Sequence, residues 1–147
     1  MKILITAPID FLSVKEVLLA RPEIIYAYQS SISEIIKLEK KYNFSGWVCS
    51  PCPTYEINSD LLSNFNNLRI LATPSTGSNH IDKNFLDKKK IEFFSLKGTE
   101  VIKEIHASSE YTLALIMMVL KKCNPAINSV SEGSWRKSEN EFRGYEL

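Results

Sequence analysis

Short apolar runs alternate with amphipathic segments from the start of the chain to Leu96. The apolar runs are rich in β-branched and aromatic residues, which predicts β-strands at residues 2–6, 23–28, 46–50, 68–73 and 91–96. The segments between them have a helical apolar spacing, which predicts helices at residues 11–20, 31–43, 58–67 and 81–90. Because each crossover between parallel strands needs a helix, residues 1–98 are expected to form an α/β fold, a flavodoxin-like parallel five-stranded sheet with helices on both faces.

Two of the predicted helices begin at side chains that can accept a hydrogen bond from a free helix N–H. Ser31 or Ser33 can cap the helix at residues 31–43, and Asp82 can cap the helix at residues 81–90. In sheets of this kind a ligand meets the loops at the carboxyl ends of the strands, so a binding site is expected there.

After the last predicted strand the alternation gives way to two helical patterns. We predict one long helix at residues 99–123, with Thr99 as its N-cap and Asn124-Pro125 as its stop. A second helix is predicted at residues 125–133, because proline is well suited to the first turn of a helix.

The stretch LALIMMVL, residues 113–120, is apolar on every side of the predicted long helix. It covers about half of a membrane span, which favours a buried helix over a transmembrane one. A helix that is apolar all round must be enclosed on all its faces, and a five-stranded sheet can cover only one of them. Something besides the sheet is therefore expected to cover this helix.

The composition indicates a globular protein. The formal net charge is +1 and 44% of the residues are hydrophobic, so neither nucleic acid nor a membrane is expected as a partner. The apolar run after Met1 is short and ends at Asp10, unlike a signal peptide. Three cysteines without a signal sequence are typical of a reducing compartment, so a cytoplasmic location is expected.

The stretch WVCSPC places Cys49 and Cys52 in a C-x-x-C pattern at the end of a predicted strand. In thiol–disulfide proteins a helix N-terminus stabilises the first thiolate of such a pair. Here Pro53 follows directly and no clear helix starts after it. A tight loop of small residues and prolines is the competing interpretation.

The stretch PSTGSNHID, residues 74–82, follows a predicted strand and precedes a predicted helix. A glycine at such a place can let backbone N–H groups face an anion. A simple turn that ends at the capping Asp82 explains the same residues. The histidines, His80 and His106, have no visible catalytic partner, and with Cys123 they lack the spacing of a metal site, so no metal is expected.

Four short motifs follow one another in the second half of the chain. They are Gly77-Ser78-Asn79-His80-Ile81-Asp82, Ser109-Glu110-Tyr111-Thr112, Gly133-Ser134-Trp135 and Gly144-Tyr145-Glu146-Leu147. Their order resembles the D-isomer-specific 2-hydroxyacid dehydrogenases, which have a G-x-(D/N)-(H/N)-(I/V)-D turn, an A-E-(H/L)-T helix, a G-x-W and a G-x-E-L. The motifs cover about the last eighty residues, and the part before them matches this family in architecture only.

The resemblance implies an oxidoreductase that transfers a hydride between NAD or NADP and a small 2-hydroxy or 2-oxo acid. It implies that residues 1–98 form the substrate domain and that residues 99–147 are interdomain helices and the lead-in to a nucleotide-binding domain. In the family the Gly-rich motif and the catalytic Arg, Glu and His follow the G-x-E-L, beyond Leu147 here, so no catalytic residue is assigned. We therefore expect the isolated chain to be inactive, and a homodimer for the full-length protein.

The site residues that the resemblance implies lie in two loops and one helix. The loop Ser75-Thr76-Gly77 holds the substrate carboxylate by backbone N–H groups, and small residues let the backbone approach an anion closely. The loop Ser50-Pro51-Cys52 faces the same cleft, and it lacks the Arg typical of members that use a phosphorylated acid. Ser108 matches a hydroxyl near the nicotinamide end of the cofactor, with Ser109 in place of the usual Ala.

Two other functions are compatible with the residues. One is a stand-alone α/β binding or regulatory domain without catalysis. The other is a thiol–disulfide protein that uses Cys49 and Cys52, which requires a low pKa for the Cys49 thiol.

Overall fold

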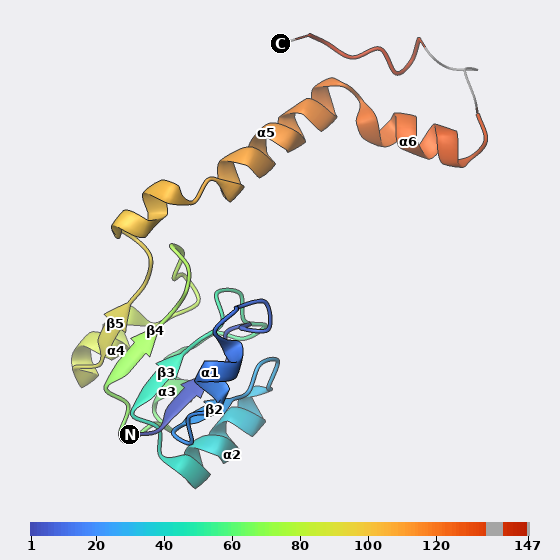
Figure 1. Cartoon of the computed structure of the whole chain (residues 1–147). Coiled ribbons are helices and arrows are strands. Elements are labelled where there is room, and N and C mark those ends of the chain that lie inside the picture. Colours follow the sequence, from blue (N-terminus) through green and yellow to red (C-terminus); the bar gives the residue numbers. More distant parts are fainter. Residues whose placement is uncertain (135–139, 147) are drawn as a thin grey trace. The chain divides into compact units, whose positions relative to one another are not determined.

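The computed structural model describes residues 1–134 and 140–146 (Figure 1). Two compact units are present, Met1–Thr99 and Glu100–Leu147, and each is described by itself. Trp135 of the G-x-W motif and Leu147 of the G-x-E-L motif lie outside the described residues.

The first unit is built on a sheet of five parallel strands. The strands are β1 (Ile3–Ile5), β2 (Ile24–Tyr26), β3 (Gly46–Val48), β4 (Ile70–Ala72) and β5 (Glu92–Phe94). Each falls inside the run predicted for it, and their order in the sheet is β2-β1-β3-β4-β5. This is a flavodoxin-like doubly wound order, so the predicted fold class is confirmed.

Four helices connect the strands of this unit. They are α1 (Lys15–Leu19), α2 (Ile32–Tyr42), α3 (Ser59–Leu62) and α4 (Lys83–Lys89). The first and third are shorter than predicted. Helix α3 stops early because the Asn64 amide donates to the carbonyls of Asp60 and Leu61, which competes with continuation of the helix.

The caps predicted for α2 and α4 are confirmed. Ser31 forms a capping box with Glu34: its hydroxyl accepts from the Glu34 N–H, and the Glu34 carboxylate accepts from the Ser31 N–H at 2.8 Å. The Asp82 carboxylate accepts from the N–H of Phe85 at 3.0 Å and begins α4. These caps set where each helix leaves the carboxyl edge of the sheet.

The larger core lies on one face of the sheet. Leu4, Trp47 and Leu71 point to this face from three adjacent strands and are at most 1% exposed. Ile35 of α2 and Leu86 of α4 belong to the same buried cluster. The helices on this side therefore cover the sheet over most of its width.

The opposite face is covered over only part of its width within this unit. Ile3 and Ile5 of β1 pack there with Leu18 of α1. On the same face, Ile70 of β4 is 38% exposed and Phe94 of β5 is 53% exposed. Helices thus lie on both faces, as predicted, but the first unit leaves apolar side chains of β4 and β5 in contact with solvent.

The Trp47 side chain joins the core to the carboxyl edge of the sheet. Its indole N–H donates to the Thr6 hydroxyl at 2.9 Å, and its ring stacks on Phe65 with centroids 5.0 Å apart. The hydrogen bond satisfies the polar atom of a buried aromatic residue, which would otherwise cost stability. It also fixes Thr6 directly after β1.

A buried carboxylate connects the end of α2 to the start of β3. Glu39 is 4% exposed, and its carboxylate accepts from the Phe44 N–H at 2.9 Å. Burial raises the pKa of Glu39, and its hydrogen bonds with the backbone of Phe44 and Asn66 oppose the rise without cancelling it.

The second unit corrects the prediction of one long helix at residues 99–123. A 3-10 helix (η1, Glu100–Glu104) comes first, and α5 (Ala107–Leu120) begins after a break. Thr99 is not an N-cap, because its hydroxyl donates to the Leu96 carbonyl at 2.8 Å. The β-branched side chains of residues 101, 102 and 105 disfavour a regular helix in this stretch.

The predicted stop at Asn124-Pro125 is also wrong. Helix α6 (Cys123–Ser131) contains both residues in its first turn, where proline is tolerated because the backbone N–H has no partner in the helix. The turn between the helices falls instead at Lys122, which has a φ of 50°.

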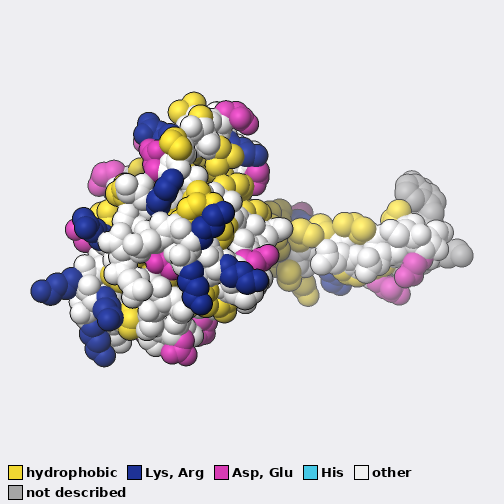
Figure 2. Space-filling view, turned by 90° about the horizontal axis from the view of Figure 1, so that it is seen from below, with side chains coloured by type: hydrophobic (Ala, Val, Ile, Leu, Met, Phe, Trp, Pro, Cys, Tyr) yellow, Lys and Arg dark blue, Asp and Glu magenta, His cyan; other side chains and the backbone are white. Residues whose placement is uncertain are grey.

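The helices of the second unit have exposed apolar surfaces. None of the α5 residues is buried, and the side chains of Tyr111, Leu113 and Val119 are 68%, 63% and 77% exposed. Figure 2 shows the apolar side chains that line this unit in yellow. No helix among the residues that the structure describes is long and apolar enough to cross a membrane.

Gly144 lies against the end of α5. The Tyr145 N–H donates to the Leu120 carbonyl at 3.0 Å, and the Lys122 ammonium donates to the Glu141 carbonyl at 2.9 Å. A Cβ atom on Gly144 would lie 2.2 Å from the Leu120 carbonyl oxygen. The glycine of the G-x-E-L motif is therefore required by the close approach of the two backbones.

We predict that Gly144→Ala detaches this segment from α5, because the methyl group has no space beside the helix. The Tyr145 amide should then exchange with solvent much faster, which hydrogen–deuterium exchange measures. Gly77→Ala is the matched control, since nothing lies within 4 Å of its added Cβ. Unchanged protection of Tyr145 in Gly144→Ala would contradict the packing described.

A second prediction concerns Glu39 and pH. A carboxyl group with a raised pKa stabilises the fold at low pH and loses that contribution as the pH rises through its folded-state pKa. The free energy of unfolding of Glu39→Gln relative to the unmodified chain should therefore increase with pH. Urea unfolding at a series of pH values measures this difference.

Glu34→Gln is the control for this series, because hydrogen bonds from Ser31 lower the Glu34 pKa. The free energy of unfolding of Glu34→Gln relative to the unmodified chain should therefore decrease with pH. The reason is that the unmodified chain loses the contribution of Glu34 as the pH falls. Glu39→Ala should cost about 1–3 kcal/mol, since it leaves the Phe44 N–H without its acceptor. Parallel pH profiles for the two Gln variants would refute the opposite pKa shifts assigned to Glu39 and Glu34.

Candidate functional site

The loops that follow the parallel strands all leave the same edge of the sheet. Thr6 follows β1, the loop Tyr28–Ser30 follows β2, and the loop Ser50–Tyr55 follows β3. The loop that begins at Thr73 follows β4. The predicted loops Ser50-Pro51-Cys52 and Ser75-Thr76-Gly77 thus come from the neighbouring strands β3 and β4.

Hydrogen bonds within the chain hold the loop after β4 in a defined shape. The hydroxyls of Thr73 and Ser75 lie 3.0 Å apart, and the Ser75 hydroxyl donates to the Gly77 carbonyl at 2.7 Å. The Ser75 carbonyl accepts from the N–H of Leu96 at 2.9 Å. Among the residues that the structure describes, none accepts from the N–H groups of Ser75, Thr76 or Gly77. These groups are therefore free to bind an anion.

A short backbone pairing joins this loop to the loop after β3. The Ile57 N–H donates to the His80 carbonyl at 2.7 Å, and the Asp82 N–H donates to the Ile57 carbonyl at 3.0 Å. Ile57 and Ile81 form a parallel bridge and are both buried. The G-S-N-H-I-D motif thus ties together the two loops that were predicted to bind substrate.

The His80 ring is partly buried beside this pairing. Within the described part of the chain its Nε2 atom has no hydrogen-bond partner. Burial lowers the pKa of His80, and a hydrogen bond with the backbone of Ser50 opposes this effect. The lowered pKa favours the neutral form of the ring, and the His80 carbonyl, which accepts from the Ile57 N–H, fixes the turn.

The two cysteines of the C-x-x-C pattern have different surroundings. Cys49 is fully buried at the end of β3, and burial raises the pKa of its thiol to about 11, although a hydrogen bond with Thr73 acts against this. Cys52 is exposed, and its N–H donates to the Ser50 hydroxyl at 3.3 Å. A redox pair needs a lowered pKa at its first thiol, so the buried Cys49 does not support the thiol–disulfide interpretation.

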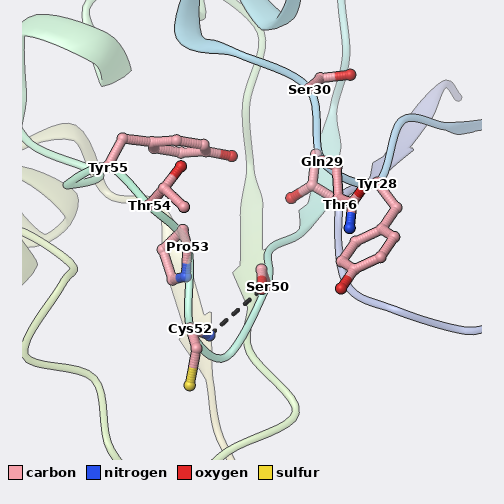
Figure 3. A pocket seen from close by; sticks show the side chains of 9 residues that line it. All are labelled: Thr6, Tyr28, Gln29, Ser30, Ser50, Cys52, Pro53, Thr54 and Tyr55. Atoms are coloured by element: carbon pink, nitrogen blue, oxygen red, sulfur yellow. Dashed lines mark hydrogen bonds between the residues drawn. The ribbon is translucent and has the colours of Figure 1, made fainter.

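A cavity of about 160 Å³ opens between the ends of β1, β2 and β3 (Figure 3). Its lining consists of Thr6, Tyr28, Gln29, Ser30, Ser50, Cys52, Pro53, Thr54 and Tyr55. Of the predicted site residues, Ser50 and Cys52 belong to this lining, whereas Pro51 and the residues of the loop after β4 do not. In Figure 3 the Cys52 sulfur points away from the other side chains.

Sequence reasoning missed most of this cavity. Thr6 is the last residue of a predicted strand, and Thr54 and Tyr55 follow the predicted loop Ser50-Pro51-Cys52, so only their position in the sequence pointed to this cavity. Burial raises the pKa of Tyr55, which a hydrogen bond with Thr6 partly offsets. Thr6 therefore links Tyr55 to the indole of Trp47 in the core.

A polar cluster beside α1 was also missed. The Asp10 carboxylate accepts from the Lys15 ammonium at 2.7 Å and from the Tyr26 hydroxyl at 2.6 Å. These hydrogen bonds lower the pKa of Asp10, with Lys15 as the larger cause. The cluster joins the loop after β1 and the start of α1 to β2.

The remaining candidates lie in the second unit. Ser108 is exposed in the first turn of α5, and its carbonyl accepts from the Thr112 hydroxyl at 2.7 Å. His106 is the residue before α5 and makes no side-chain cap. Among the residues that the structure describes, no three His, Cys, Asp or Glu side chains are grouped so that they could hold a metal ion.

Comparison with known proteins supports the resemblance read from the motifs. No family model matches the chain. Erythronate-4-phosphate dehydrogenase of Tolumonas auensis is 30% identical over 78 residues, which are 53% of this chain and 20% of that protein.

Solved structures resemble the whole chain. D-lactate dehydrogenase of Aquifex aeolicus, complexed with NAD and lactic acid, matches with a TM-score of 0.71 at 17% identity over 99% of this chain. NAD-dependent formate dehydrogenase of Staphylococcus aureus, in complex with NAD, matches with a TM-score of 0.72 at 18% identity over the entire chain. The match spans 41% and 46% of those two proteins.

These likenesses confirm that the chain has the fold of the D-isomer-specific 2-hydroxyacid dehydrogenases. The resemblance in sequence to a curated relative extends over about half of the chain. The chain itself spans less than half the length of these relatives.

The different surroundings of the cysteines yield a testable prediction. At neutral pH an alkylating reagent should modify Cys52 rapidly and leave Cys49 unmodified, because a buried thiol with a pKa of about 11 supplies almost no thiolate. Peptide mass spectrometry after iodoacetamide treatment resolves the two sites. Cys52→Ser should leave Cys49 unreactive, and equal labelling of both cysteines would contradict the burial of Cys49.

Proposed function

We propose that this chain is the substrate-binding portion of an NAD(P)-dependent oxidoreductase that acts on a 2-hydroxy or 2-oxo acid. The observation that carries the proposal is the loop Ser75-Thr76-Gly77, which offers free N–H groups at the carboxyl edge of a flavodoxin-like sheet. The relatives named above are dehydrogenases, and one was solved with NAD and lactic acid.

The proposed role of this loop is to bind the substrate carboxylate. Its N–H groups would donate to the carboxylate oxygens, and Gly77 leaves open space where another residue would have a Cβ. The bridge between Ile57 and Ile81 would hold the loop after β3 against the loop after β4, so that Ser50, Pro51 and Cys52 border the same ligand. Because the loop holds these donors in place, they would orient the bound carboxylate and, with it, the neighbouring reactive carbon.

The hydride donor would be NAD or NADP, and the residues of this chain do not form its usual binding site. The chain has glycines at positions 46, 77, 98, 133 and 144, and none of them forms the G-x-G-x-x-G turn that binds a dinucleotide. The chain's own contribution would be to bind and orient the acid. Ser108, at the start of α5, is proposed to contact the nicotinamide end of the cofactor.

The substrate is proposed to be an acid without a phosphate group. The curated relative is named for a phosphorylated acid. The loop Ser50-Pro51-Cys52 of this chain has no Arg or Lys that could pair with phosphate.

The second unit is proposed to link this domain to a nucleotide-binding domain. The apolar side chains of α5 are exposed in the unit as described, and a domain packed against them would bury them. We propose that a complete enzyme of this kind is a cytoplasmic homodimer. The alternative is a stand-alone binding domain without catalysis.

The proposal predicts acid binding without turnover. In ¹⁵N-resolved NMR, a short 2-hydroxy acid such as D-lactate should shift the amide signals of Thr76 and Gly77, because these N–H groups would exchange water for the carboxylate. NADH and any 2-oxo acid should give no oxidation of NADH above background. Gly77→Val should weaken binding about tenfold, which corresponds to about 1.4 kcal/mol.

Ser63→Ala serves as the control, since Ser63 follows α3 and, within the described residues, its hydroxyl bonds only to the Ser59 carbonyl. Acid binding that leaves the signals of Thr76 and Gly77 unchanged would refute the assigned carboxylate site. Turnover of NADH by the isolated chain would refute its assignment as the substrate-binding portion alone.

A further inference from the structure

Gln29 has an unusual backbone conformation for its position. Its φ is 62°, in the left-handed region that costs a non-glycine residue about 1 kcal/mol or more. Asn43, Lys90 and Lys122 have similar φ values, but each adjoins a helix end, where this conformation terminates or starts a helix. Gln29 lies instead at the third position of the turn Ala27–Ser30, which the bond from the Ser30 N–H to the Ala27 carbonyl closes at 3.4 Å, and this turn holds its positive φ.

The strained residue lines the cavity at the ends of β1, β2 and β3. Figure 3 shows the Gln29 carboxamide and the Tyr55 hydroxyl on opposite sides of the same space, with Thr54 and Ser30 at its border. Thr6, on the cavity wall, is only 2% exposed and is fixed by the bond from Trp47. The fixed Thr6 and the Gln29 side chain, which the loop after β2 presents, therefore line the same cavity.

The lining of the cavity is polar but carries no charge. Its 9 residues include four with aliphatic hydroxyls, two tyrosines and one carboxamide, and none is Lys, Arg, His, Asp or Glu. A carboxylate or phosphate group there would lose water without gaining a cation, which is unfavourable. An aliphatic group would leave the hydroxyls and the carboxamide without partners. A neutral group that both donates and accepts hydrogen bonds fits this lining.

The size of the cavity limits the length of such a group. A volume of about 160 Å³ is close to that of a cavity that holds one benzene molecule. Ser50 lines the cavity and belongs to the loop that is held beside the loop after β4. A short substituent on an acid bound at Ser75-Thr76-Gly77 could extend toward this cavity past Ser50.

We infer that the cavity is the subsite for the distal part of the acid, that it takes an uncharged, hydroxylated substituent of a few atoms, and that Gln29 is the residue that selects it. This inference rests on the proposed function, since it assumes that the carboxylate binds at the loop after β4. Gln29 is a specificity residue: its carboxamide hydrogen-bonds the hydroxyl, and the neutral lining rejects a charged group.

The test is an NMR titration of the ¹⁵N-labelled chain with four D-acids that differ beyond C2. They are D-glycerate, with a hydroxyl; D-lactate, with a methyl; D-malate, with a carboxylate; and 3-phospho-D-glycerate, with a phosphate. D-Glycerate should shift the amides of Gln29, Ser30 and Thr54 together with those of Thr76 and Gly77. It should bind about tenfold more tightly than D-malate or the phosphorylated acid, and several-fold more tightly than D-lactate.

Two variants identify the role of Gln29. Gln29→Gly removes the carboxamide but suits the backbone conformation, so the fold should be retained and the preference for D-glycerate over D-lactate should be lost. Lys90→Gly is the matched control, because it makes the same exchange at another residue with positive φ, at the end of α4. It should leave the affinities for all four acids unchanged.

The possible results separate the inference from the proposed function. Shifts at Thr76 and Gly77 without shifts around the cavity would overturn the subsite and leave the carboxylate site standing. Equal affinity for the four acids, or an unchanged preference in Gln29→Gly, would also overturn it. No shift at either place would contradict both the subsite and the proposed function.

Discussion

The parallel pairing of five strands is the constraint on which the first unit depends. Parallel neighbours cannot be joined by a tight turn, so each connection leaves the carboxyl edge of the sheet, crosses a face as a helix and returns at the other edge. The order β2-β1-β3-β4-β5 then places the loops after β1, β3 and β4 side by side at one edge. The small and polar residues of these loops meet only because the strands are parallel.

The site at this edge combines two kinds of polar chemistry. The loop after β4 offers backbone N–H groups and open space at Gly77, which is suited to an anion. The cavity beside it has hydroxyls and a carboxamide but no charge, which is suited to a neutral group. The pairing of Ile57 with Ile81 holds the two parts in register. A small hydroxylated acid has both features in one molecule, which is the basis of the inferred subsite.

Some of these features could be predicted from the sequence because they depend on neighbouring residues. The strands follow β-branched runs, and the caps at Ser31 and Asp82 depend on side chains three residues from their partners. The long helix was predicted wrongly because its apolar content concealed the poor helix propensity of residues 101–105, which form a 3-10 turn instead. Pro125 was predicted to be the first residue of the last helix. It lies in the first turn of α6, which starts two residues earlier than predicted.

The parts of the site that sequence reasoning missed depend on contacts between distant residues. Asp10 and Tyr26 meet only when β1 and β2 pair, and Thr6 meets Trp47 only across β1 and β3. The backbone strain at Gln29 has no signature in residue type, since left-handed positions favour Gly or Asn. Cys49 and Cys52 show the reverse case, in which burial of the first thiol does not support the redox chemistry that the local pattern suggests.

A crystal structure of the chain soaked with the 2-oxo acid pyruvate tests the central claim most directly. The account predicts pyruvate with its carboxylate within hydrogen-bond distance of the Thr76 and Gly77 N–H groups, and with its carbonyl carbon on the side of Ser50. Pyruvate bound at the amino edge of the sheet, or an ordered crystal with no pyruvate at the loop after β4, would contradict the account.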